Sequence, residues 1–113
     1  MILSHRIENN ICIVELRNDL ILDKVYELPS EISAILNKVT PAALVINLKH
    51  VTHIDSAGWG ALITLSKKTK LPKGVAICQF SNDILGIPFQ AKFSKIIPTF
   101  QTEQEAIAFM HTQ

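Results

Sequence analysis

The sequence predicts one α/β domain, with a mixed sheet of four to five strands and about four helices. Two observations predict this fold class. Short runs rich in apolar and β-branched residues are typical of strands, and the longer segments between them carry apolar residues at helical spacing. After the first two runs, strands and helices alternate along the chain, an order typical of a sheet whose later part pairs mostly in parallel.

A hairpin is expected at the N-terminus. Residues 1–7 form a first candidate strand and residues 11–16 a second, more β-branched one, with the asparagine pair at 9–10 as the turn between them. Residues 17–20 form the next turn, in which Asn18 is a residue type that tolerates a positive φ.

The first helix is expected over residues 23–38, where apolar residues recur at helical spacing. Pro29 interrupts this segment. Either the main helix begins there, with proline in its first turn, or a longer helix bends there. The most apolar strand follows at residues 43–48 and is expected in the centre of the sheet.

The second half of the chain continues the alternation. A second helix is expected over residues 56–70, a strand over residues 75–80 and a short helix over residues 81–85. Residues 96–100 favour a short edge strand, because Pro98 would weaken a central one.

The chain closes with a predicted helix. Thr102 and Glu105 have the spacing of a capping box, in which each side chain satisfies a free backbone N–H of the first turn. The residues expected to face the core are Ala106, Phe109 and Met110.

Length and composition define the class of protein. The 113 residues leave room for one domain, residues 1–113, with a usable core. An apolar share of 48% and a charged share of 19% are those of a globular chain, and a formal charge of +1 argues against a nucleic-acid binder. No apolar run is long enough for a membrane span, and charge comes too early for a signal peptide. Cys12 and Cys78 lie in strand-like segments and are expected to be buried, reduced thiols of a cytoplasmic protein.

One stretch, Asp55-Ser56-Ala57-Gly58, occupies the junction between the central strand and the second helix. Asp and Ser are residue types that cap helices, whereas Ala and Gly let another backbone or an anion come close. A serine in this place lies at a helix N-terminus, where free N–H groups and the helix dipole favour negative charge, including that of a phosphate. Ser56 is therefore either a helix cap alone or a phosphorylation site.

A catalytic role for Ser56 is not favoured. His50 and His53 are near it in sequence, but the Gly-x-Ser-x-Gly hydrolase elbow is absent, because Ile54 stands in the place of its first glycine. The four histidines are scattered without the spacing of a zinc site, and no glycine-rich phosphate-binding motif is present. We therefore predict no enzyme activity, no metal and no cofactor.

Trp59 and Ile63 lie on the second helix beside its main apolar stripe. Two alternatives follow. Both side chains belong to the core, or they stay partly exposed beside Ser56 as a docking patch, since aromatic anchors often dominate protein interfaces.

The segment around Ser56 resembles the STAS domain family, named for sulfate transporters and anti-sigma factor antagonists. An apolar strand at residues 44–48 is followed by a short polar link, by Asp55-Ser56-Ala57-Gly58-Trp59-Gly60 and by an apolar helix, which is similar to the family pattern Asp-Ser-Ser/Thr-Gly-Leu-Gly. Weaker similarity at residues 18–20 and 102–106 extends the resemblance over nearly the whole chain.

The resemblance implies a regulatory function. In regulatory members of the family, the domain binds an anti-sigma factor that is also a serine kinase. The kinase phosphorylates the serine directly after the motif's aspartate, which is Ser56 here, and a serine phosphatase resets the cycle. We therefore expect a non-catalytic bacterial anti-sigma factor antagonist. Its expected partner-binding residues are Asp55, Ser56, Ala57, Gly58, Trp59, Ile63 and Asp23.

The sequence also departs from the family pattern. Ala57 replaces the usual second hydroxyl residue, Trp59 replaces the usual leucine, and Ile21 stands where an acidic residue is common, with Asp19 and Asp23 close by. The alternative function is that of a STAS accessory subunit of an ABC-type lipid transporter. In such subunits the same helix packs constitutively on the transporter ATPase.

Overall fold

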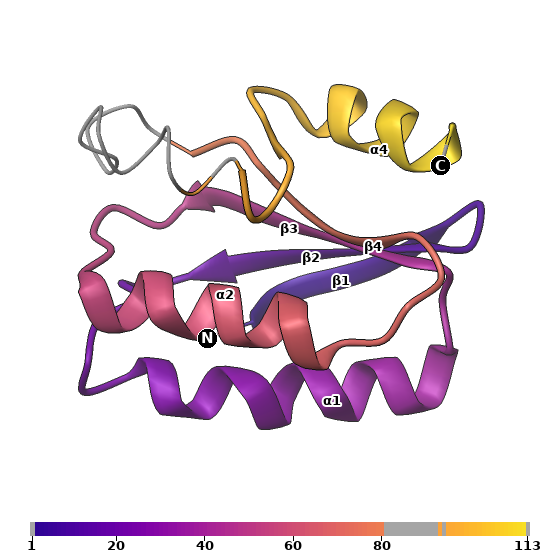
Figure 1. Cartoon of the computed structure of the whole chain (residues 1–113). Helices are drawn as coiled ribbons and strands as arrows, with labels where there is room; N and C mark the ends of the chain where they lie inside the picture. Colours follow the sequence, from indigo (N-terminus) through magenta and orange to yellow (C-terminus); the bar gives the residue numbers. More distant parts are fainter. Residues whose placement is uncertain (1, 81–92, 94, 113) are drawn as a thin grey trace.

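The computed structural model describes residues 2–80, 93 and 95–112. A five-stranded mixed sheet forms the centre of the domain (Figure 1). Its strands lie in the order β1 (Ile2–Glu8), β2 (Ile11–Arg17), β3 (Ala43–His50), β4 (Gly74–Cys78) and β5 (Thr99–Phe100). The β1–β2 pair is antiparallel and the other pairs are parallel, as the strand–helix alternation predicts.

Helices cover both faces of the sheet in Figure 1. A short 3-10 helix, η1 (Val25–Glu27), leads into α1 (Leu28–Val39), which lies beside α2 (Ser56–Lys68) on one face. The opposite face carries α4 (Glu103–His111). The described residues thus hold three α-helices where about four were expected, and the helix predicted over residues 81–85 lies outside them.

Local sequence signals correctly predict the hairpin turn, the start of α1 at its proline and the cap of α4. The hairpin is confirmed, and Asn9, Asn10 and Asn18 all have positive φ, which asparagine tolerates better than most residues. Pro29 lies in the first turn of α1, so the main helix begins there. The Thr102 hydroxyl accepts a hydrogen bond of 3.1 Å from the backbone N–H of Glu105, which confirms the predicted cap of α4.

Two apolar cores lie on the two faces of the sheet. The larger one joins α1 and α2 to residues such as Val14, Ile46 and Ile77, and the smaller one packs Ala106 and Met110 of α4 on the other face. Both cysteines are buried and unpaired, as predicted. Burial raises the pKa of the Cys78 thiol to about 12, and the nearby Glu103 charge adds to this effect.

A polar cluster fixes the N-terminal end of α4 to the sheet. Asn47 is only 2% exposed, and its amide nitrogen donates hydrogen bonds to Gln79 (3.2 Å) and to Glu103 (2.8 Å). Arg6 of β1 forms an ion pair with the same carboxylate. Burial alone would raise the pKa of Glu103, but the hydrogen bonds and charge of Arg6, with the Asn47 bond, outweigh it and lower that pKa. No sequence pattern predicts this cluster, because its members are far apart along the chain.

Among the described helices, none has both the length and the apolar character that a membrane crossing requires.

Candidate functional site

The candidate site lies where the chain leaves the carboxyl ends of the parallel strands β2 and β3. Leu20 and Ile54 form an isolated parallel bridge beyond the two strands. The Leu20 N–H donates to the His53 carbonyl (2.9 Å), and the Asp55 N–H donates to the Leu20 carbonyl (3.2 Å). These bonds fix the loop before α2 against the loop after β2. The junction predicted around Ser56 is therefore held from both sides.

Asp55 connects these two loops to the first turn of α2. One carboxylate oxygen, Oδ1, accepts from the Gly58 N–H at 2.8 Å, and the other, Oδ2, accepts from the Leu22 N–H at 3.1 Å. Asp55 therefore satisfies a free N–H of the helix and also fixes the segment that precedes η1.

Ser56 is the first residue of α2, and its side chain is exposed. Asp55 is the N-cap, so the suggestion that Ser56 itself caps the helix is wrong: Asp55 has the extended backbone of a cap, whereas Ser56 is already helical. Among the described residues the Ser56 hydroxyl has no hydrogen-bond partner. The hydroxyl is thus accessible at the positive end of the helix dipole.

Gly58 makes the close approach of α2 to the neighbouring loop possible. A Cβ at this position would lie 2.0 Å from the Leu20 carbonyl oxygen and 2.8 Å from a side-chain carbon of Ile54. Both distances are shorter than any van der Waals contact. Gly58 therefore serves packing at the site, and its buried position leaves it no exposed surface for a partner.

Asp19 organises the loop before α2 from the other side. Its Oδ1 accepts hydrogen bonds from the Thr52 hydroxyl (2.7 Å) and from the His53 N–H (3.1 Å), and the His53 ring lies 3.6 Å from Oδ2. The Thr52 hydrogen bond, followed by the His53 N–H and the His53 charge, lowers the pKa of Asp19. Asp19 therefore remains a carboxylate at neutral pH and holds residues 52–53 in place.

The structure places Trp59 in the core. Its side chain is only 5% exposed and packs against Phe93 in an edge-to-face arrangement, with the ring centroids 4.4 Å apart. This agrees with the core alternative and excludes the exposed docking patch for Trp59, because the indole is covered in the free chain. Ile63 and Ala57 are half-buried against the same core.

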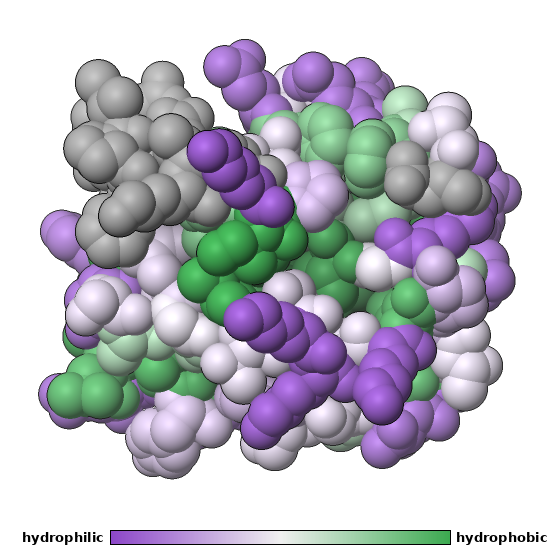
Figure 2. Space-filling view, in the orientation of Figure 1, coloured by the Kyte–Doolittle hydropathy of each residue, from purple (hydrophilic) through white to green (hydrophobic). Residues whose placement is uncertain are grey.

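Exposed apolar residues occur instead on the segment between β2 and α1. Leu22 is 69% exposed and Tyr26 is 71% exposed, and Asp23 between them is exposed as well. Hydrophobic surface is visible over this segment at the lower left of Figure 2. Asp55 links the segment to the N-terminus of α2 through the Leu22 N–H, so both belong to one surface around Ser56. We call Leu22, Asp23, Tyr26, Asp55 and Ser56 the α2 entry surface.

Leu22 and Tyr26 are not among the site residues predicted from the sequence, although a signal was present for Tyr26. The inward-facing residues of this region are Val25, Leu28 and Ile32, and Tyr26 lies off their helical stripe. An apolar residue outside the stripe is a candidate for exposure.

The described residues around Ser56 form no nucleophile–base pair and no group of metal ligands. Within residues 2–80, 93 and 95–112, no three His, Cys, Asp or Glu side chains are grouped as metal ligands. His53 contacts Asp19 and Thr52, and no described hydrogen bond joins it or His50 to Ser56.

Comparison with known proteins places the chain in a family. Residues 3–106 match the family described as STAS domain. Curated protein sequences include no match.

Solved structures of similar fold span nearly the whole chain. An anti-sigma factor antagonist from Mycobacterium paratuberculosis has a TM-score of 0.83 at 20% identity, covering 98% of this chain and 93% of that one. The anti-sigma factor antagonist SpoIIAA in its unphosphorylated form has a TM-score of 0.63 at 17% identity, covering 97% and 100%. A sulfate transporter family protein from Wolinella succinogenes has a TM-score of 0.69 at 16% identity, covering 95% and 89%. At these identities the likeness shows a shared fold.

Proposed function

The chain belongs to the STAS domain family, and from that premise we propose that it is a non-catalytic anti-sigma factor antagonist. Its partner is an anti-sigma factor that is also a serine kinase. Phosphorylation of Ser56 releases the complex, and a serine phosphatase restores binding. The domain proposed to do this is the whole chain, residues 1–113.

The observation that carries the proposal is the state of Ser56. The motif serine is exposed, has no side-chain hydrogen bond to a described residue, and begins a helix whose cap is already supplied by Asp55. A serine needed for capping would be occupied by backbone N–H groups. Here the hydroxyl is free for a kinase, and the helix dipole would stabilise the phosphate that results.

Phosphorylation would change the α2 entry surface in a defined way. A phosphate adds about −1.5 to −2 charges at pH 7. The new charge would lie next to the Asp55 carboxylate and on the same surface as the exposed Leu22 and Tyr26. A partner that covers these apolar side chains must remove water from the dianion, which costs free energy unless the dianion is paired.

The first test is phosphate mapping. The full chain is incubated with ATP and the candidate anti-sigma kinase from the same genome, and mass spectrometry locates the phosphate. We expect a single phosphate on Ser56 and none in Ser56→Ala. Ser66→Ala is the matched control on the same helix: the Ser66 hydroxyl already donates to the Ile63 carbonyl (2.8 Å) and is partly buried. Phosphate elsewhere, with Ser56 unmodified, would contradict the proposal.

Leu22 and Tyr26 are expected to contribute the apolar contacts to the partner. Replacing either with serine should weaken binding by at least about 1 kcal/mol, because exposed apolar anchors at the centre of an interface contribute most of its binding energy. The stability of the free chain should change little, since both side chains are largely exposed. Isothermal titration calorimetry against the kinase measures the effect.

The control for this test is Ile96→Ser, which removes an apolar side chain that is 48% exposed on the segment before β5, outside the α2 entry surface. If Leu22→Ser and Tyr26→Ser bound the kinase as tightly as Ile96→Ser does, the interface would lie outside the α2 entry surface.

The alternative is a transporter-associated STAS subunit, which the fold shared with a sulfate transporter family protein keeps under consideration. In that case the interface is constitutive. Ser56 would carry no phosphate in cells, and the chain would co-purify with a transporter ATPase whether position 56 is serine or aspartate.

A further inference from the structure

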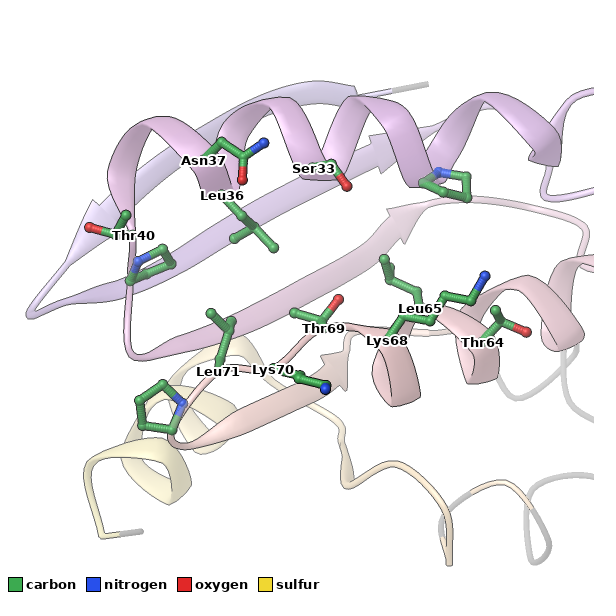
Figure 3. A pocket seen from close by; sticks show the side chains of 13 residues that line it. Ser33, Leu36, Asn37, Thr40, Thr64, Leu65, Lys68, Thr69, Lys70 and Leu71 are labelled. Carbon is green, nitrogen blue, oxygen red and sulfur yellow. The ribbon is translucent and has the colours of Figure 1, made fainter.

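A groove lies between α1 and α2, on the outer side of the helical layer (Figure 3). Its volume is about 580 Å³, within the range of roughly 300 to 1,000 Å³ that is usual for small-molecule sites. The groove reaches the C-terminal ends of both helices, whereas Ser56 is at the N-terminal end of α2. The lining residue of α2 that is nearest to Ser56 in sequence is Thr64, eight residues or about 12 Å along the helix, so Ser56 lies outside the groove.

Apolar side chains form the floor of the groove. Leu36 of α1, Leu65 of α2 and Leu71 of the following loop come from three segments and converge on the space between the helices in Figure 3. Leu65 is buried, and the other two are half-buried against the main core. Hydroxyl groups, such as those of Ser33 and Thr64, line the sides. The floor therefore suits a hydrocarbon chain.

Two lysine side chains bring positive charge to the lining of the groove. Lys68 and Lys70 both line it, and its lining includes no Asp or Glu. Neither lysine forms an ion pair with a residue that the structure describes. The C-terminal ends of α1 and α2 each contribute roughly −0.5 charge nearby, which leaves a net charge of about +1 from the two lysines and the two helix ends.

We propose that this groove binds an amphipathic monoanion, specifically a medium-chain fatty-acid carboxylate. The hydrocarbon chain would lie on the three leucines, and the carboxylate would be held by Lys68 and Lys70. This site is separate from the proposed switch at Ser56 and does not depend on it.

The experiment titrates the full chain with dodecanoate, below its micelle concentration, by isothermal titration calorimetry. Dodecanol, with the same chain but no charge, and acetate, with the charge but no chain, are titrated in parallel. We expect dodecanoate to bind at least tenfold more tightly than either, because each of the other two compounds lacks one of the two contacts.

Variants locate the site. The double substitution Lys68→Gln with Lys70→Gln should weaken dodecanoate binding by roughly tenfold, the size expected for two partly exposed charge contacts. Lys67→Gln is the matched control, since Lys67 is the neighbouring lysine of α2 and does not line the groove. Ser33→Trp should block binding by filling the groove from an exposed position on α1.

Three outcomes would overturn the proposal: no binding of dodecanoate, equal binding of dodecanol, or dodecanoate binding that neither the double lysine variant nor Ser33→Trp weakens. Circular dichroism on each variant confirms that a loss of binding is not a loss of fold.

Discussion

Replacing Gly58 with alanine is expected to lower the free energy of unfolding by about 3 kcal/mol. The added methyl group would lie 2.0 Å from the Leu20 carbonyl oxygen, a backbone atom that no side-chain rotation can move away. The first turn of α2 must then move away from the loop that follows β2. That shift would lengthen the hydrogen bonds that the Asp55 carboxylate accepts from the N–H groups of Leu22 and Gly58.

Gly60→Ala is the matched control for this prediction. Gly60 belongs to the same helix, but a Cβ there would meet nothing within 4 Å. Alanine has a higher helix propensity than glycine, so Gly60→Ala should raise the free energy of unfolding by up to about 1 kcal/mol. Urea denaturation, followed by circular dichroism, measures both. Equal effects of the two substitutions would show that the close approach at Gly58 is not what determines its stability contribution.

The second large effect is expected on binding rather than on folding. Ser56→Asp should weaken binding to the anti-sigma partner by roughly 100-fold, about 2.7 kcal/mol, whereas Ser56→Ala should bind as tightly as the unmodified chain. Aspartate places a charge beside Asp55 on the α2 entry surface, and the partner must desolvate that charge. The fold should tolerate it, because acidic residues are favourable in the first turn of a helix.

Thr64→Asp separates position from charge in this experiment. Thr64 is an exposed residue of the same helix, about two turns beyond Ser56. The Thr64→Asp substitution adds the same charge to the protein as Ser56→Asp does, but it adds that charge outside the α2 entry surface. It should therefore leave the affinity for the partner nearly unchanged. If Thr64→Asp weakened binding as much as Ser56→Asp, net charge rather than the position of Ser56 would control the complex.

The features that could be predicted from sequence are those determined by neighbouring residues. The turn at Asn9-Asn10, the proline in the first turn of α1 and the Thr102 cap of α4 each depend on a few consecutive positions, and all three are present in the structure. The second half of the capping box differs, because the Glu105 carboxylate accepts from the Thr102 hydroxyl. The apolar character of residues 43–48 likewise placed β3 in the centre of the sheet.

The features that could not be predicted depend on segments far apart in the chain. Both Asp55 and Ser56 are capping residue types, and the hydrogen bond from the Gly58 N–H shows that Asp55 is the cap. The additional bond from the Leu22 N–H to Asp55 joins segments that are far apart in the sequence, so no local pattern predicts it. The sequence left both a buried and an exposed position possible for Trp59, because α2 is apolar over more than one face. Its burial depends on contact with Phe93. The polar cluster around Asn47 joins residues from four segments that are far apart in the sequence.

In the proposed switch, a phosphate on Ser56 controls partner binding. The most direct test measures the affinity of the candidate anti-sigma kinase for the unmodified chain and for the chain phosphorylated at Ser56, by calorimetry on the same preparation before and after phosphorylation. We expect tight binding by the unmodified chain and binding weakened by about 100-fold or more after modification, in line with a cost of about 2.7 kcal/mol. Equal affinity of the two forms would show that phosphorylation of Ser56 does not control the complex.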